Sequence, residues 1–277
     1  MKRLLRADIY RVMKSRLTLV ALILCLAFPV LIVLMYVGIR AVSGLAGDAG
    51  AELDMLYNAN SIIASAYSLT NNIGLVIPAF AGILVCSDYS NGTLRNKVIA
   101  GNRRADIYLS HLVVSILFSV VLITVYAVMT TGLALIFFPF KTAPGTDLGW
   151  EILCFVVNGT LSFAFMATLS TMLALTLRSI APTLIFTIVF AMLLLMVTSV
   201  VSLMDYEKFR HLVYFIPTFT GSFFNLGSSL SLTMILNGGV TGDSEKLMFA
   251  EGVLSYLFFG GLHTVIGLTV FGKRDIK

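Results

Sequence analysis

The side chains best suited to binding chemistry lie in a short polar stretch, 88–97, between two long hydrophobic runs without charge, 73–85 and 112–140. The wider loop, 88–106, carries four basic residues against two acids, and the positive-inside rule therefore places it in the cytoplasm. We expect a small structured turn there, on which a soluble partner could push. The residues that we single out in it are Asp88, Asn91, Gly92, Thr93, Leu94, Arg95 and Lys97.

The rest of the chain offers no arrangement typical of catalysis or of a metal site. Residues 267–273 have the spacing of a phosphate-binding loop, but Arg274 follows where Ser or Thr is needed, and the stretch ends a hydrophobic run without a preceding strand. The cysteines, Cys25, Cys86 and Cys154, lack the spacing of metal ligands. We therefore expect a chain that is not catalytic by itself and that binds no metal or cofactor.

One ionisable side chain, His263, is expected within the cores of the hydrophobic runs. A lone histidine in a membrane span more often forms a hydrogen bond to a neighbouring helix than it marks an ion pathway. Asn158 and Ser162, on a polar face that continues to Thr168 and Thr171, could line a substrate path with His263. Small and hydroxyl residues that pack helices together are the more common explanation of such a face.

The composition assigns the chain to the helical membrane proteins. It is 58% hydrophobic and only 12% charged, whereas a soluble domain of 277 residues must cover its surface with polar groups. The hydrophobic runs are about 20 residues or longer and are continuous, not alternating, which is typical of membrane helices. Six spans are predicted, over residues 17–39, 68–87, 107–138, 151–177, 180–204 and 250–271.

The distribution of charge predicts the orientation of this single transmembrane domain, 1–277. With both termini inside, the cytoplasmic segments (1–16, 88–106, 178–179 and 272–277) hold 14 Lys or Arg and 4 Asp or Glu, while the external segments hold 5 and 10. The positive-inside rule therefore favours cytoplasmic termini. The same distribution accounts for the net charge of +5, so we expect no nucleic-acid partner.

Two segments outside the spans have a character of their own. Residues 1–16 are basic, and Leu5, Ile9, Val12 and Met13 share one helical face, which predicts an amphipathic helix in the membrane interface. Residues 211–237 are apolar but contain a proline, two glycines and a run of Ser and Thr. We expect them to form a re-entrant or interfacial external hairpin before the last span, because irregular backbone at membrane depth must lie against protein or a water-lined cavity.

Three short sequences, DYSNGTL at 88–94, IAGNRR at 99–104 and IYLS at 107–110, resemble the first cytoplasmic loop of ABC type-2 transporter permeases. In that family an acidic residue and Gly-Thr precede a basic Ala-Gly-x-x-Arg region and the third span. The tail at 271–276, FGKRDI, is similar to the usual end of the family. The resemblance extends over the whole chain and is most specific in 88–110.

The resemblance implies a half-pore in the bacterial cell membrane. Two permease subunits, the same chain or a related one, would pair, and each would bind a separate ABC ATP-binding subunit that holds ATP and Mg. The loop after the second span would form a coupling helix, over 90–101, that is seated in a groove of this ATPase.

The loop residues suit a coupling helix. Gly92 and Asn91 permit the turn, Thr93 or Asn91 would cap the helix, and Gly101 would end it. Its apolar face would consist of Leu94, Val98 and Ile99, and its charged face of Arg95 and Lys97.

The expected function is therefore that of an exporter permease subunit, which moves an amphipathic or hydrophobic cargo (a peptide, drug or lipid) out of the cell. One alternative is an ion-coupled secondary transporter or channel, which the scarcity of charge at mid-membrane disfavours. Another is a membrane scaffold without transport activity. Ser222 and His263 also weakly resemble the dyad of an intramembrane protease, but the flanking motif and a second acid are missing.

Overall fold

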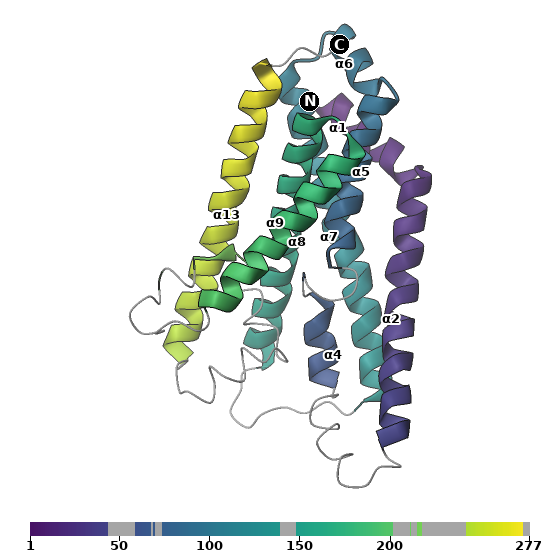
Figure 1. Cartoon of the computed structure of the whole chain (residues 1–277), viewed down its shortest axis with the longest axis vertical. Coiled ribbons are helices and arrows are strands. Elements are labelled where there is room, and N and C mark those ends of the chain that lie inside the picture. The colour runs from purple at the N-terminus through teal and green to yellow at the C-terminus, as the bar shows by residue number, and fades with distance from the viewer. Residues whose placement is uncertain are drawn as a thin grey trace.

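The computed structural model describes residues 1–43, 59–67, 69, 74–138, 148–201, 211, 215–217 and 242–273. Within these ranges every regular element is a helix, and the all-helical class predicted from the sequence is confirmed for them. The helices are α1 (Lys2–Met13), α2 (Arg16–Ser43), α4 (Ala59–Ala66), α5 (Val76–Ser90), α6 (Thr93–Ile99), α7 (Arg104–Phe137), α8 (Leu148–Leu177), α9 (Ile180–Val201) and α13 (Gly242–Lys273) (Figure 1).

Five of these helices are long and apolar enough to cross a membrane, namely α2, α7, α8, α9 and α13. The chain is accordingly a multi-pass membrane protein. Each of the five lies within a few residues of its predicted span, except that α13 begins at Gly242, ahead of the expected 250–271. The predicted span at 68–87 corresponds to α5, whose 15 residues extend only about 22 Å, against about 30 Å for the hydrocarbon core.

The predicted end of the helix at α5 was wrong. The helix continues to Ser90, beyond the expected end at 87, because the carboxylate of Asp88 is buried and paired with cations instead of facing water. The connection between the first two predicted spans contains α4, which is helical because Ala59 and Ile62 pack into an apolar cluster with Ala134 of α7. The predicted hairpin at 211–237 lies outside the described residues, apart from 211 and 215–217.

The helix at the centre of the bundle is α8, which packs against α5, α7, α9 and α13. In the most apolar stretch of 18 residues, 61% of α8 is buried, against 17% of α9. Small and hydroxyl side chains allow this close packing, and the hydroxyls of Ser170 and Thr171 donate back to carbonyls of the preceding turn. The outward faces of α2, α9 and α13 are apolar, as a lipid environment requires.

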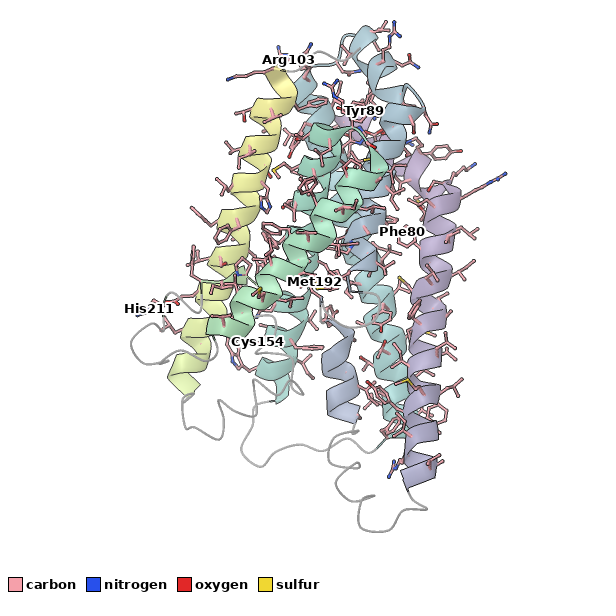
Figure 2. The ribbon with its side chains drawn as sticks, viewed as in Figure 1. Phe80, Tyr89, Arg103, Cys154, Met192 and His211 are labelled. Atoms are coloured by element: carbon pink, nitrogen blue, oxygen red, sulfur yellow. The ribbon has the colours of Figure 1, made fainter. Side chains whose placement is uncertain are left out.

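One end of the bundle collects both termini of the described chain together with α6 (Figure 1). Arg104 at the start of α7 donates to the carbonyl of Gly272 in α13, at 2.9 Å. The Tyr89 hydroxyl of α5 donates to the carbonyl of Leu175 in α8, at 3.0 Å. Figure 2 labels Tyr89 and Arg103 at this end. Apart from Arg40 and Lys246, every described Lys and Arg lies in one of the helices, helix ends or turns at this end of the bundle. This end is therefore basic.

The close contact between α7 and α13 leads to a prediction about Gly267. A Cβ atom at this position would collide with the fully buried ring of Tyr108, whose hydroxyl lies 3.4 Å from the carbonyl oxygen of His263. Gly267→Ala should therefore destabilise the protein by about 1–3 kcal/mol, the typical cost of overpacking. Thermal unfolding in detergent is the measurement.

Gly261 provides the matched control in the same helix, because a Cβ atom there meets no other atom within 4 Å. Gly261→Ala should leave the unfolding temperature unchanged or raise it slightly, since alanine favours the helix. Equal effects of the two substitutions would contradict the close packing of α13 on Tyr108.

Candidate functional site

The turn from α5 into α6 depends on one glycine. The backbone N–H groups of Asn91 and Gly92 close the end of α5 by donating to the carbonyls of Ser87 and Tyr89, at 3.0 and 3.1 Å. Gly92 then has φ +67°, in the left-handed region that favours glycine, and it is also the N-cap of α6. The chain thus leaves α5 and begins a new helix within three residues.

Neither Asn91 nor Thr93 caps α6 with its side chain, so this part of the sequence-based prediction was wrong. Thr93 is already the first residue of the helix. Its hydroxyl points back to α5, where it donates to the carbonyl of Asp88 at 3.0 Å, and it lies 3.4 Å from the Arg11 guanidinium. Thr93 therefore joins α6 to α5 and α1 and does not satisfy the free N–H groups of its own helix.

The C-terminal end of α6 follows the prediction for Gly101. This residue has φ +82°, its N–H donates to Val98, and the N–H of Asn102 donates to Lys97. Together these two bonds form a Schellman motif. The helix is shorter than the expected 90–101 because the left-handed glycines at its two ends confine it to Thr93–Ile99.

The two faces of α6 differ from those predicted. Leu94 is buried and Val98 packs beside it, but Ile99 is 73% exposed and shares the outer face with Arg95. Lys97 points inward, because it is one turn from Leu94 and so lies on the same side of the helix. The outer face of α6 consists of Arg95, Asn96, Ile99 and Ala100.

The inner face of α6 ends in a buried ionic quartet, which consists of Asp8 and Arg11 of α1, Asp88 of α5 and Lys97 of α6. Lys97 Nζ lies 2.6 Å from Asp8 Oδ1 and 3.6 Å from Asp88 Oδ2. Arg11 forms a close ion pair with Asp88 and lies 3.8 Å from Asp8 Oδ1. The carboxylates are 3% and 1% exposed. The Lys97 side chain is 14% exposed and that of Arg11 34%, so two buried carboxylates are neutralised by two cations that reach them from the partly exposed side.

The electrostatics of the quartet show why each member needs the others. Burial by itself raises the pKa of Asp8, but hydrogen bonds from Lys97 and Ser110 outweigh it, so the pKa lies below its ordinary value. Burial lowers the pKa of Lys97, and the hydrogen bond to Asp8 offsets this only in part. Removal of one charge would leave its partner buried and uncompensated, which is strongly destabilising.

His111 of α7 adjoins the quartet. Its Nε2 atom lies 3.1 Å from Lys97 Nζ and 3.3 Å from Asp88 Oδ2. A neutral imidazole can use this atom to accept a hydrogen bond from Lys97 or to donate one to Asp88, but not both at once. The expectation that His263 is the one ionisable side chain within the spans was therefore wrong, because α7 buries His111 less than two turns from its polar start.

His263 belongs to α13, and its side chain lies between α8 and α9. Its Nδ1 atom is 3.3 Å from the Thr168 hydroxyl, and its ring stacks on Phe165 with the centroids 5.2 Å apart. Phe190 of α9 meets the same ring edge-on. This is the contact between helices that a lone histidine in a membrane span was expected to make.

The other predicted members of a substrate path satisfy their donors within α8. Asn158 donates to the carbonyl of Cys154 and Ser162 to that of Gly159, and both side chains are buried. Asn158 lies ten residues, about 15 Å, from Thr168 along the helix. The Oδ1 atom of Asn158 has no hydrogen-bond partner among the described residues. The bonds of Asn158 and Ser162 to carbonyls of their own helix are typical of polar side chains in a packed helix.

A family model described as a protein of unknown function (DUF2705) matches residues 49–277. The chain belongs to the DUF2705 family. No curated protein matches it. In this DUF2705 protein the matched segment contains Asp88, Lys97 and His111, whereas Asp8 and Arg11 precede it.

Sequence reasoning singled out only two members of the quartet, Asp88 and Lys97. Asp8 could have been noticed, because it is the one acid in a basic helix and lies close to the face of Leu5 and Val12. A carboxylate beside the apolar stripe of a helix usually has a buried partner. No local pattern in the sequence identifies that partner, Lys97, which lies 89 positions away in the DUF2705 chain.

The lowered pKa of Asp8 predicts an acid-labile contribution to stability. Ionised Asp8 stabilises the fold above its unfolded pKa, close to 3.8, and this contribution is lost as the pH falls through the lower, folded pKa. Thermal unfolding in detergent, measured from about pH 5 to about pH 3, should therefore show a smaller acid-induced loss for Asp8→Asn than for the wild type.

Asp106→Asn is the control, since this carboxylate lies in the first turn of α7 and is no member of the quartet. It should retain the acid-induced loss of the wild type. An Asp8→Asn protein with that same loss would contradict the role given to the ionised carboxylate.

Proposed function

We propose that this chain is the transmembrane permease subunit of an ATP-driven exporter of the ABC type-2 kind. The proposal rests on the geometry of α6. It is a short helix between α5 and α7 that is bounded by two left-handed glycines, with one face tethered to the bundle and the other exposed. A helix held in this way suits the transfer of a push from a soluble subunit to the membrane helices.

The outer face of α6 has the chemistry of a docking surface. Ile99 is a large apolar side chain that is 73% exposed beyond the end of the bundle, and Arg95 and Asn96 beside it can form hydrogen bonds. Apolar anchors with a polar rim are typical of protein interfaces. The partner in this proposal is an ABC ATP-binding subunit, which supplies the ATP and Mg that this chain does not itself bind.

The inner face of α6 provides the route by which force enters the bundle. Leu94 packs into the cluster of Val85, Ile107 and Tyr108, so a displacement of α6 acts on α5 and α7 directly. Lys97 extends the connection to α1 through Asp8. A rigid, buried attachment transmits motion because packed interiors resist compression.

The membrane topology that goes with this function has six spans and cytoplasmic termini. The five long helices would be five of these spans, and the shorter apolar helix α5 would belong to the sixth. The basic end of the bundle, which carries α6, faces the cytoplasm of a bacterial cell membrane by the positive-inside rule. The helix α1 lies there in the interface, and two permease chains pair to form the pore.

The cargo in this proposal is amphipathic or hydrophobic, such as a peptide, drug or lipid. Asn158, Ser162 and His263 are candidates for its path, and the external segment 211–237 for its exit. The alternative of an ion-coupled transporter finds less support, because Asp8 and Asp88 lie at the basic end of the bundle and each is paired with a cation. Ion-coupled transporters place such groups near mid-membrane.

The outer face of α6 provides the test of the docking surface. Arg95→Glu combined with Ile99→Glu should abolish co-purification of an ATPase from native membranes and the ATPase activity that the permease stimulates, because two anchors of the interface are lost together. Both side chains are exposed, so the bundle itself should insert and unfold as in the wild type.

Lys246→Glu is the control, since it makes the same change of charge as Arg95→Glu at the start of α13, at the opposite end of the bundle. It should retain the ATPase. A preparation that contains no ATPase with either the wild type or the control would overturn the exporter assignment and favour the channel or scaffold alternatives.

A further inference from the structure

The buried quartet has two complete ways to pair its charges. All four distances between its cations and its carboxylates lie within 4.0 Å. In the pairing observed here, Lys97 bonds to Asp8 and Arg11 to Asp88. In the other pairing, Arg11 would bond to Asp8, now 3.8 Å away, and Lys97 to Asp88, now 3.6 Å away.

The two pairings connect different helices. The observed one joins α1 to α6 and α1 to α5, so it clamps the N-terminal helix to the hairpin of α5 and α6. The other would place one ion pair within α1, between positions three residues apart, and the second between α5 and α6. It would leave no ionic bond between α1 and the hairpin.

We propose that exchange between these pairings is a switch that releases the hairpin of α5 and α6 from α1. Both states are charge-balanced, so neither leaves a carboxylate buried without a cation, which is the costly condition. Each cation has to move by only about 1 Å to reach the 2.7–2.9 Å of a strong ionic hydrogen bond. Because the two states have equal numbers of ion pairs, their exchange would give this end of the bundle a two-state element.

The groups around the quartet suit both states. His111 Nε2 lies 3.1 Å from Lys97 and 3.3 Å from Asp88, so it can accept a hydrogen bond from the ammonium group between the two carboxylates. Ser110 donates to Asp8 Oδ2 at 2.7 Å, which leaves Oδ1 free to change its cation. Ser110 thus holds Asp8 in place while the cations move, and His111 stays within hydrogen-bond reach of Lys97.

Release would not detach α1 from the bundle. Val12 is buried in the main apolar cluster, with Leu5 and Ile9 packed against it, and Ser110 keeps its bond to Asp8. Only the ionic contacts of α1 with α5 and α6 would change. That this change accompanies the push of an ATPase on α6 rests on the proposed function; the exchange itself does not.

Four double variants separate the two states, and each removes one positive and one negative charge. Asp8→Asn with Lys97→Gln, and Arg11→Gln with Asp88→Asn, leave one ion pair that clamps α1 to the hairpin. Asp8→Asn with Arg11→Gln, and Asp88→Asn with Lys97→Gln, leave one ion pair that does not. Each class is reached by two different pairs of substitutions, so one misfolded variant does not remove its class.

The distance between α1 and α6 provides the readout. Spin labels at Met13→Cys and Ile99→Cys occupy side chains that are 74% and 73% exposed, and the native cysteines, all buried, are replaced by alanine. The full chain is measured in lipid nanodiscs by pulsed electron paramagnetic resonance. The releasing variants should show a longer mean distance, by roughly 5 Å, the rise of one helical turn. The clamping variants should keep the wild-type distance.

A single distance distribution shared by all four variants would overturn the switch, as would a lengthening in the clamping class alone. Because the labelled chain is measured without any ATPase, this outcome is independent of the exporter assignment. ATPase binding is tested separately on the unlabelled wild type, because the label at position 99 occupies the proposed docking surface. A class-specific shift together with a wild type that binds no ATPase would support the switch and refute the proposed function, while an ATPase bound to the wild type with four equal distributions would do the reverse.

Discussion

The burial of two carboxylates at the basic end of the bundle is the constraint on which this part of the structure depends. An ionised group removed from water is costly unless it meets an opposite charge and hydrogen bonds. Asp8 and Asp88 obtain both only when α1, α5 and α6 approach within ion-pair distance of one another. The orientation of α6 is therefore determined by charge pairing as well as by the apolar contact of Leu94, and its outer face is exposed as a consequence.

The bundle combines a densely packed centre with an end for which we propose a second pairing of charges. In α8 the hydroxyl groups bond within their own helix and the small side chains allow close contact with four neighbours, so alternative packings are few. At the basic end, by contrast, the same four charges admit two pairings of equal number. In the proposed function, a push on α6 would therefore act on α5 and α7 through Leu94 and at the same time on the pairing of these four charges.

Much of the fold could be predicted because hydropathy is a property of consecutive residues. The five long spans lie close to their predicted positions, and Gly101 ends α6 as its conformational freedom suggested. The errors arose where the same side chain could make either of two contacts. The Thr93 hydroxyl could cap a helix or bond back to Asp88, and the structure chooses the second. Ile99 was assigned to one face with Leu94 and Val98 because it is apolar, although its position on the helix places it on the exposed side.

The sequence by itself determined that the chain is a helical membrane protein, where its long spans lie, and that a short helix between two glycines follows α5. These features depend on local composition and on backbone preferences. Only the tertiary structure decided that Lys97 turns inward, that His111 joins it, and that Asp8 is its partner. Asp8 and Lys97 are 89 positions apart, and an ion pair depends on distance in space, which no local pattern in the sequence records.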